Sequence, residues 1–310
     1  MEFKHYSVLL EESVEGLGVK ENGIYVDGTL GGGGHADRIL SQNNSCRLIG
    51  IDQDSDAHRA AAERLKKFGA RFTPVKNNFK NITAILREQE IDAIDGAVLD
   101  LGVSSYQLDE AKRGFSYMHD APLDMRMDQS GEKNGAIVIN TYTKEELSRI
   151  FFAYGEEKWS KRIAEFIVRE REKHPIETTG QLVEIIKAAV PAAARAEGGH
   201  PAKRIFQAVR IEVNGELELL EGALRDFTAA LKPGGRLAVI TFHSLEDRIV
   251  KKTFQALGTG CTCPKSFPVC VCGNRPQIRL ITRKPILPGR QELDENSRSK
   301  SAKLRIAEKI

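Results

Sequence analysis

A glycine-rich run preceded by an acid is the part of the sequence best suited to binding a small ligand. Residues 27–35 read DGTLGGGGH and stand between a predicted strand and a predicted helix. Glycines let the backbone approach a ligand closely, and the first turn of a helix offers unpaired N–H groups to an anion. A pyrophosphate and the carboxylate of an amino acid would suit this place equally well.

Two further acids narrow the class of ligand. Asp52 follows the second predicted strand, at about the ~20-residue interval at which an acid meets ribose hydroxyls, and Asp100 ends the fourth predicted strand. A nicotinamide-dependent dehydrogenase is the alternative. Its G-x-G-x-x-A fingerprint is matched by Gly31, Gly33 and Ala36. However, Asp27 would repel a pyrophosphate and could hold an ammonium group, and hydride transfer needs no carboxylate at Asp100. The acids therefore favour methyl transfer from S-adenosylmethionine.

A cysteine cluster near the end of the sequence is a second candidate for chemistry. Four of the five cysteines form a CxC-x6-CxC pattern, namely Cys261, Cys263, Cys270 and Cys272. The few cysteines fit a reducing compartment without a disulfide framework. Four thiolates could close a tetrahedral zinc site, although CxC is tighter than the usual ~2–4 residue spacing. Structural zinc and reduced thiols in a loop both stay open, and we assign no metal ligand.

The elements that position these residues alternate over the first hundred positions. Apolar runs predict strands at 24–27, 47–51, 72–75 and 96–103, and helical patterns occupy 35–42, 55–68 and 82–89. Alternating strands and helices predict parallel pairing with helices on both faces. The expected fold is an α/β, doubly wound, Rossmann-like core whose ligands bind at the carboxyl ends of the strands.

The pattern changes after Ser105. We expect an irregular loop over 106–134, helices only over 144–190, and an amphipathic helix over 215–231. Pro233 should end that helix, with Gly234 and Gly235 supplying the positive φ of a turn before the next strand. The runs QIRLIT and SAKLRIAE should pair antiparallel at a sheet edge. The core then spans 1–105 and 215–310, with an all-helical domain inserted at 106–214.

Charge is nearly balanced, with 46 basic and 43 acidic residues, so net charge neither establishes nor excludes RNA as a partner. Basic side chains gather near the middle and in the last segment: Lys203, Arg204, Arg210, Arg279, Arg283, Lys284, Arg290, Arg298, Lys300, Lys303 and Arg305. No run approaches the ~18 apolar residues of a membrane helix, and the N-terminus lacks the apolar core of a secretory signal. We expect a cytoplasmic enzyme with no membrane partner.

Motifs along nearly the whole sequence resemble one family, the bacterial 16S rRNA (cytosine-N4)-methyltransferases, also called RsmH or MraW. They include DGTLGGGGH at 27–35, LDLGVSSYQLD at 99–109, RGFSYMHDAPLDMRMD at 113–128 and PGGRLAVITFHSLEDRIVK at 233–251. The glycine loop alone is generic. LDLGVSS, DMRMD and FHSLEDR in this order are specific to the family.

The resemblance implies an S-adenosylmethionine site built from seven residues: Gly33, Gly34, His35, Asp52, Phe79, Asp100 and Gln107. Loop N–H groups would hold the methionine carboxylate, Asp52 the ribose hydroxyls, and Phe79 would form an apolar wall near the adenine. Asp100 and Gln107 would line the methionine end. We expect no acid–base role for His35.

The resemblance also implies the substrate, a cytosine in the decoding region of 16S rRNA within the small ribosomal subunit. Its exocyclic N4 amine is a poor nucleophile, so the enzyme must orient it and accept its hydrogen bonds. Asp100 is the candidate catalytic acceptor, although it could serve the cofactor alone. Many amino-group methyltransferases have Asp/Asn-Pro-Pro-Tyr here, whereas this sequence has Asp-Leu-Gly-Val.

The missing tyrosine leaves the stacking partner of the base open among Tyr106, Phe115 and Tyr117. A base must leave its stack to enter a pocket, which favours a loop or single-stranded RNA. Segment 106–134 would cover the pocket, and the inserted helices and basic residues would meet phosphates. A non-catalytic RNA-binding or ribosome-assembly module is the second alternative, and a homodimer stays open.

Overall fold

The computed structural model describes residues 7–196, 199–264, 267–269 and 271–310. The chain divides into two compact units. The first comprises Met1–Gly102 and Leu217–Ile310, and the second comprises Val103–Glu216. From the sequence we expected the inserted domain to span 106–214. No helix among the described residues combines the length and apolar character needed to cross a membrane.

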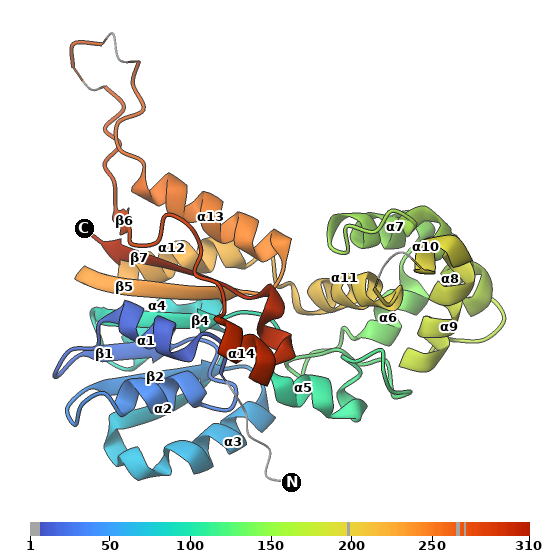
Figure 1. Cartoon of the computed structure of the whole chain (residues 1–310), viewed down its shortest axis with the longest axis horizontal. Helices are drawn as coiled ribbons and strands as arrows, with labels where there is room; N and C mark the ends of the chain where they lie inside the picture. Colours follow the sequence, from blue (N-terminus) through green and yellow to red (C-terminus); the bar gives the residue numbers. More distant parts are fainter. Residues whose placement is uncertain (1–6, 197–198, 265–266, 270) are drawn as a thin grey trace. The chain divides into compact units, whose positions relative to one another are not determined.

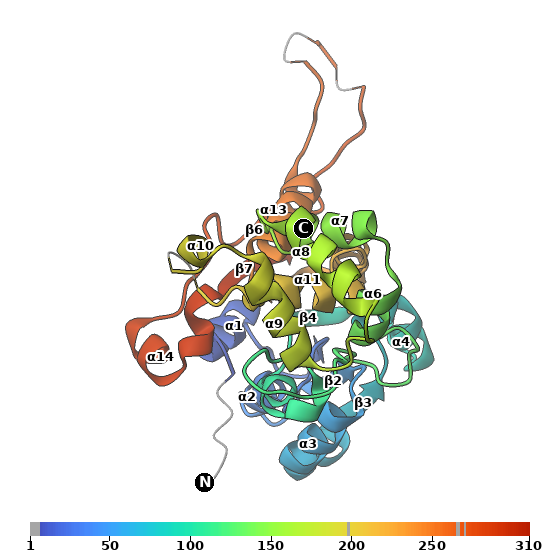
Figure 2. The ribbon, with the colours of Figure 1, turned by 90° about the vertical axis from the view of Figure 1, so that its right-hand side faces the viewer.

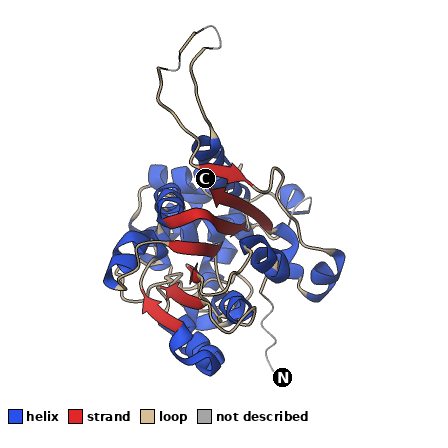
Figure 3. Cartoon of the chain, turned by 90° about the vertical axis from the view of Figure 1, so that its left-hand side faces the viewer, coloured by secondary structure: helices blue, strands red, loops and turns tan. Residues whose placement is uncertain are grey.

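The first unit is built on one mixed sheet. Its strands, among the described residues, are β1 (Ile24–Asp27), β2 (Arg47–Asp52), β3 (Phe72–Lys76), β4 (Ile94–Asp100), β5 (Leu231–Thr241), β6 (Ile278–Leu280) and β7 (Lys303–Lys309). The strand order is β3-β2-β1-β4-β5-β7-β6 (Figures 1 and 3). The pairs among β1 to β5 are parallel, whereas β7 pairs antiparallel with both β5 and β6. The predicted antiparallel pairing of the last two strands is confirmed, but only β6 lies at the edge.

Helices cover both faces of this sheet (Figure 3). One face carries α1 (Leu10–Leu17), α2 (Gly34–Leu40) and α3 (Ser55–Leu65); the other carries α4 (Ile82–Glu88), α12 (Leu220–Ala230) and α13 (Ser244–Gly258). Neighbouring residues of one strand enter opposite cores, as Leu48 and Ile49 do, because side chains alternate along a strand. Strands covered on both faces are apolar throughout. The expected doubly wound α/β core is confirmed.

Shorter elements complete this unit: η1 (Lys66–Arg71), η2 (Phe79–Asn81), α14 (Arg290–Glu295) and η4 (Ser297–Ser301). The second unit contains only helices and irregular segments among its described residues (Figure 2). Its elements are α5 (Ser105–Asp109), η3 (Ala111–Arg113), α6 (Gly135–Thr141), α7 (Lys144–Ala153), α8 (Ser160–Arg171), α9 (Thr179–Ala189), α10 (Ala192–Ala196) and α11 (Ala202–Asn214).

The apolar core of the second unit follows from helical spacing. In α7, Leu147, Ile150 and Phe151 repeat at intervals of three and four residues, and all three are fully buried. Capping boxes start both α7 and α9, because a threonine N-cap and a Glu or Gln three residues later satisfy each other's backbone N–H groups.

The structure corrects three sequence predictions. The helix expected over 215–231 does not begin at Gly215, which ends α11 with φ +62°; α12 begins at Leu220. A glycine in the left-handed conformation is a strong helix stop. Residues 231–235 belong to β5 rather than to a helix end and turn, and only Gly234 has positive φ. A register shift against β4 between Ile94 and Gly96 accommodates this stretch as a bulge. Finally, segment 106–134 contains most of α5 and all of η3.

Candidate active site

Three strands of the first unit end in an aspartate. Asp27 closes β1, Asp52 closes β2 and Asp100 closes β4. These strands are parallel neighbours in the order β2-β1-β4, so all three carboxyl groups lie at the same edge of the sheet. The chain leaves β1 toward β2 but continues from β4 toward β5, which makes the β1–β4 boundary the topological switch point. Ligands of doubly wound folds bind at such a boundary.

The glycine loop after β1 is tied to both neighbouring strands. The Gly28 amide donates to the Val98 carbonyl of β4 over 2.9 Å. The Gly31 amide donates to Asp52 Oδ2 over 2.8 Å, at the end of β2. These two hydrogen bonds therefore fix the path of the loop along the carboxyl ends of β4 and β2.

Gly33 and Gly34 are required by the protein's own packing as well as by its backbone. Gly33 is the N-cap of α2 and has φ +74°, a region that side chains disfavour. A Cβ on Gly34 would lie 1.8 Å from Ser7 Oγ, and one on Gly33 would lie 3.2 Å from Leu65 Cδ1. The glycines thus allow close approach of protein segments, a reason that the sequence did not reveal.

Asp27 is a buried carboxyl group with an unsatisfied atom. Only 1% of its surface is exposed. Its Oδ1 accepts from the Thr29 amide over 3.2 Å, but Oδ2 has no hydrogen-bond partner among the described residues. Burial raises the pKa of Asp27 to about 7; the Thr29 N–H opposes that rise, whereas the charge of Asp52 adds to it. A buried acceptor without a donor is costly, so this oxygen is suited to a cationic or N–H-bearing ligand.

Asp100, like Asp27, has a buried carboxylate oxygen without a hydrogen-bond partner among the described residues. That oxygen is Oδ1, although a quarter of the side chain is exposed. Burial raises the pKa of Asp100 well above its ordinary value, and the negative charges of Asp27, Glu246 and Glu292 raise it further. The Asp100 amide donates to Thr29 Oγ1 over 2.6 Å, so Thr29 contacts both acids through separate atoms.

His35 lies in the first turn of α2 and is buried. Its Nε2 is 3.1 Å from the Val8 carbonyl, which can only accept, so Nε2 carries the proton. Nδ1 faces Asp100 Oδ2 at 3.9 Å, a contact that is an ion pair only when the ring is protonated. His35 therefore links the start of α2 to Asp100.

Asp52 holds backbone with both of its oxygens. Oδ1 accepts from the Asp54 amide over 2.9 Å, and Oδ2 accepts from Gly31. Asp54 provides the N-cap of α3 by accepting from the Asp56 amide. Burial raises the pKa of Asp52. Because each carboxylate oxygen has two lone pairs, Asp52 can still accept hydroxyl donors from a ligand.

The two remaining predicted site residues lie in different units. Phe79 begins η2 and packs against the core of the α4 face; its Cβ would be 3.4 Å from a Cβ built on Gly28, so it lies beside the glycine loop. Gln107 belongs to the second unit, where it is buried and its Oε1 accepts from the Ser104 amide in the capping box of α5. Its place at the methionine end of a cofactor stays a prediction.

Sequence reasoning missed two carboxylates near Asp100. Glu246 is buried in the capping box of α13 and accepts from the Phe242 amide over 2.8 Å. The spacing His-x-x-Glu before an apolar helix is the signal that could have found it. Glu292 of α14 accepts from the Leu9 amide over 2.9 Å, a contact between distant segments for which the sequence offers no signal.

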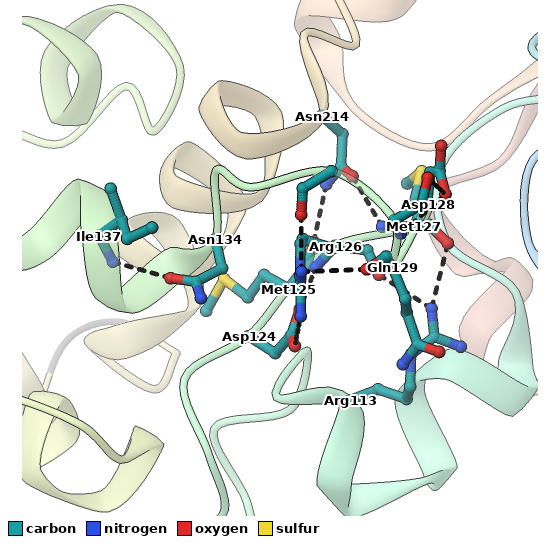
Figure 4. A network of polar contacts seen from close by, with 12 residues as sticks. Arg113, Asp124, Met125, Arg126, Met127, Asp128, Gln129, Asn134, Ile137 and Asn214 are labelled. Carbon is teal, nitrogen blue, oxygen red and sulfur yellow. Dashed lines mark hydrogen bonds and ion pairs between the residues drawn. The ribbon is translucent and has the colours of Figure 1, made fainter.

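The DMRMD motif organises the second unit (Figure 4). Asp124 pairs with Arg126 through two short contacts, 2.9 and 2.7 Å. Asn214, at the end of α11, accepts from the Met127 amide and donates to the Met125 carbonyl, both over 2.8 Å. The segment predicted as an irregular loop is therefore held against α11 by a defined network.

Three aromatic residues were candidates for stacking on a base. Phe115 is only 6% exposed and belongs to the core of the second unit. Tyr117 stacks on His200, with ring centroids 4.6 Å apart. Tyr106 is 47% exposed, so its ring is the most accessible of the three.

Some of the basic residues are engaged within the protein. Arg210 forms two 2.8 Å contacts with Glu216, and both side chains are largely buried. Arg305 of β7 is buried and pairs with Asp247 over 2.7 Å. These two arginines therefore form internal ion pairs.

The fold defines the protein as a doubly wound α/β protein, with three aspartates at the carboxyl edge of its sheet. The sequence model of the MraW methylase family matches residues 2–310. The chain belongs to that family, which confirms the resemblance inferred from the motifs.

Close relatives cover the full length. The ribosomal RNA small subunit methyltransferase H of Clostridium botulinum is 60% identical over 311 residues, covering all of both chains. The ribosomal RNA small subunit methyltransferase H 2 of Agathobacter rectalis is 57% identical and covers 100% of this chain and 99% of that protein. Among solved structures, an rRNA methylase from Streptococcus thermophilus aligns with 12% identity and a TM-score of 0.44, covering 96% of this chain and 95% of that chain.

Proposed function

We propose that this protein is a cytoplasmic enzyme that transfers a methyl group from S-adenosylmethionine to the exocyclic N4 amine of a cytosine in the decoding region of 16S rRNA, within the small ribosomal subunit. One observation supports S-adenosylmethionine as the cofactor. Asp27 and Asp100 flank the switch point of the sheet, and each has a buried oxygen without a partner among the described residues. Family membership and the relatives' names support the RNA part.

The negative charge of Asp27, Asp52 and Asp100 at the sheet edge fits this cofactor better than it fits a dinucleotide. S-adenosylmethionine brings an ammonium group, and buried carboxylates with raised pKa values are stabilised by a nearby cation. A pyrophosphate would instead add negative charge to three acids. Asp52 has lone pairs left for ribose hydroxyls, Phe79 offers an apolar wall, and the loop at Gly33 and Gly34 would border the methionine carboxylate.

When bound, S-adenosylmethionine supplies a methyl group already activated by its sulfonium. The protein's remaining task is to hold the acceptor amine, whose lone pair is delocalised into the cytosine ring. Asp100 would accept a hydrogen bond from that amine and favour its pyramidal form. The ionised carboxylate is the stronger acceptor, and a bound cation nearby would lower the pKa that burial has raised.

The second unit and basic residues of the first unit would recognise RNA. Tyr106 offers an exposed ring for stacking on an unpaired base. Phosphates would be met by exposed basic residues for which no internal pair is found in the described part of the chain: Lys203, Arg283, Lys284, Arg290 and Lys300. Because such contacts release counterions, RNA affinity should fall steeply as salt increases.

The deciding experiment maps methyl groups by mass spectrometry. Small ribosomal subunits from cells that lack this activity are incubated with the purified protein and labelled S-adenosylmethionine. We expect one N4-methylated cytosine in the decoding region. Asp100→Asn should lose the product, whereas Asp92→Asn, which alters an exposed carboxyl group, should keep it. Retention of labelled NAD in place of S-adenosylmethionine would favour the dehydrogenase alternative, and intact subunits without a new methyl group would favour a binding module.

A further inference from the structure

A long excursion separates α13 from β6 (Figure 1). Its described residues between 259 and 277 contain neither helix nor strand. Several apolar side chains on it are exposed, with Phe267 at 50%, Val269 at 70% and Val271 at 74%. Irregular segments longer than ~12–15 residues are uncommon in compact proteins unless they have a function. A hydrophobic core does not hold this segment, so another interaction must hold its two arms together.

Three thiols come together between the outgoing and returning arms of this excursion. The Sγ atoms of Cys261, Cys263 and Cys272 all lie within 4.8 Å of one another. The Sγ atoms of Cys261 and Cys272 are 3.7 Å apart. Two sulfurs that share a tetrahedral zinc ion, with Zn–S bonds of ~2.3 Å, lie ~3.8 Å apart, whereas a disulfide would bring them to ~2.05 Å. The spacing fits a shared ion and not a disulfide.

The backbone around these sulfurs also suits thiolates. Cys263 Sγ accepts from the amides of Val271 and Cys272, each over 3.3 Å. Cys272 Sγ accepts from the Thr262 amide over 3.4 Å. N–H groups directed at sulfur favour its charged form, and hydrogen bonds to ligand atoms are a regular feature of metal sites.

We propose that Cys261, Cys263 and Cys272 bind a zinc ion that ties the outgoing and returning arms of the excursion together. Clustered thiolates select zinc among the common divalent ions. The tight CxC spacing argued against zinc in the sequence, but the Sγ atoms of Cys261 and Cys263 both lie within 4.8 Å of Cys272 Sγ, which comes from the returning arm. Cys270, the fourth cysteine of the cluster, lies outside the described residues. The cluster shares no residue with the aspartates at the sheet edge, and its all-cysteine ligands are typical of a structural zinc site.

The test measures metal content in the full chain. The protein is purified without a metal-affinity tag, in the presence of a reductant and trace zinc, and analysed by mass spectrometry for bound metal. We expect about one zinc ion per chain. The combined Cys261→Ser, Cys263→Ser, Cys272→Ser variant should contain none. Cys46→Ser is the matched control, since Cys46 is buried in the sheet core, and it should keep the zinc.

Cobalt substitution provides a second measurement. Cobalt(II) bound by at least three thiolates gives intense sulfur-to-metal charge-transfer absorption, and we expect this band in the wild-type protein but not in the triple variant. Far-UV circular dichroism should show that the triple variant stays folded, because its substitutions are confined to the excursion. A wild-type protein without zinc, a triple variant that retains it, or a cobalt spectrum of fewer than three thiolates would each overturn the proposal.

Discussion

Asp27→Asn should make the protein more stable at neutral pH while weakening its cofactor site. Asparagine has the shape of aspartate but never ionises. In the native state the carboxyl group is buried, one oxygen lacks a partner among the described residues, and its pKa is raised from 3.8 to about 7. Its ionisation therefore opposes folding. A neutral side chain at this position removes that opposition.

The sign and size of this stability change follow from the raised pKa of Asp27. Because the folded-state pKa is raised, the stability that the protonated carboxyl contributes is fully present below its ordinary pKa and is lost as pH rises through 7. The ionisation of Asp27 alone should remove about 4 kcal/mol of stability by pH 8 relative to strong acid. Between pH 5 and pH 8, the advantage of Asp27→Asn should grow by about 2–3 kcal/mol.

Urea unfolding of both proteins at these two pH values measures the difference. Asp92→Asn serves as the control, because an exposed carboxyl group should show no such trend. Calorimetric titration should also show S-adenosylmethionine binding at least about tenfold weaker in Asp27→Asn, equivalent to about 1.4 kcal/mol. If the stability difference between wild type and Asp27→Asn is the same at both pH values, Asp27 ionises in the folded protein at its ordinary pKa and the reasoning is wrong.

Three further substitutions test separate parts of the structure. Gly33→Ala places a side chain at φ +74° and should cost roughly 1–2 kcal/mol in urea unfolding, whereas Gly222→Ala, in a helix with open space, should be neutral or stabilising. Arg210→Ala strands a largely buried carboxylate and should cost about 3 kcal/mol, but Arg225→Ala, from an exposed pair, should cost less than about 0.5 kcal/mol. Tyr106→Ala should slow methylation of small subunits at least about tenfold, because stacking contributes about 1–3 kcal/mol. Tyr106→Phe should retain the wild-type rate. Equal rates for Tyr106→Ala and the wild-type protein would exclude stacking at Tyr106.

Local patterns were enough to predict the core of the fold. The runs that form β1, β2 and β4 are short and apolar, each ends in an acid, and helical patterns separate them, so the sheet edge with Asp27, Asp52 and Asp100 could be expected. Two features could not be predicted from local patterns. The insertion of β7 between β5 and β6 depends on pairing between distant segments, and the helix boundary at Gly215 depends on the conformation of one residue inside an apolar pattern.

The sequence predicted which residues form the candidate site better than it predicted the surroundings of those residues. The pKa of Asp100 depends in part on Glu246 and Glu292, which come from segments remote in sequence. Basic side chains were equally ambiguous, because a sequence does not show that Arg210 points inward to Glu216. Charge and position along the chain are local properties, whereas burial and partners are set by the whole fold.

The insertion of the second unit between β4 and β5 has a consequence for biosynthesis. When β4 leaves the ribosome, the strand that pairs with its outer edge has not been made, and Ala97, Val98 and Leu99 present an apolar edge. Unpaired edges of this kind invite association with other chains. Translating residues 101–230 at about 5–20 residues per second takes about 7–26 seconds. For that interval a nascent chain depends on chaperones or on spacing between ribosomes, and β5 ends the exposure when it pairs with β4.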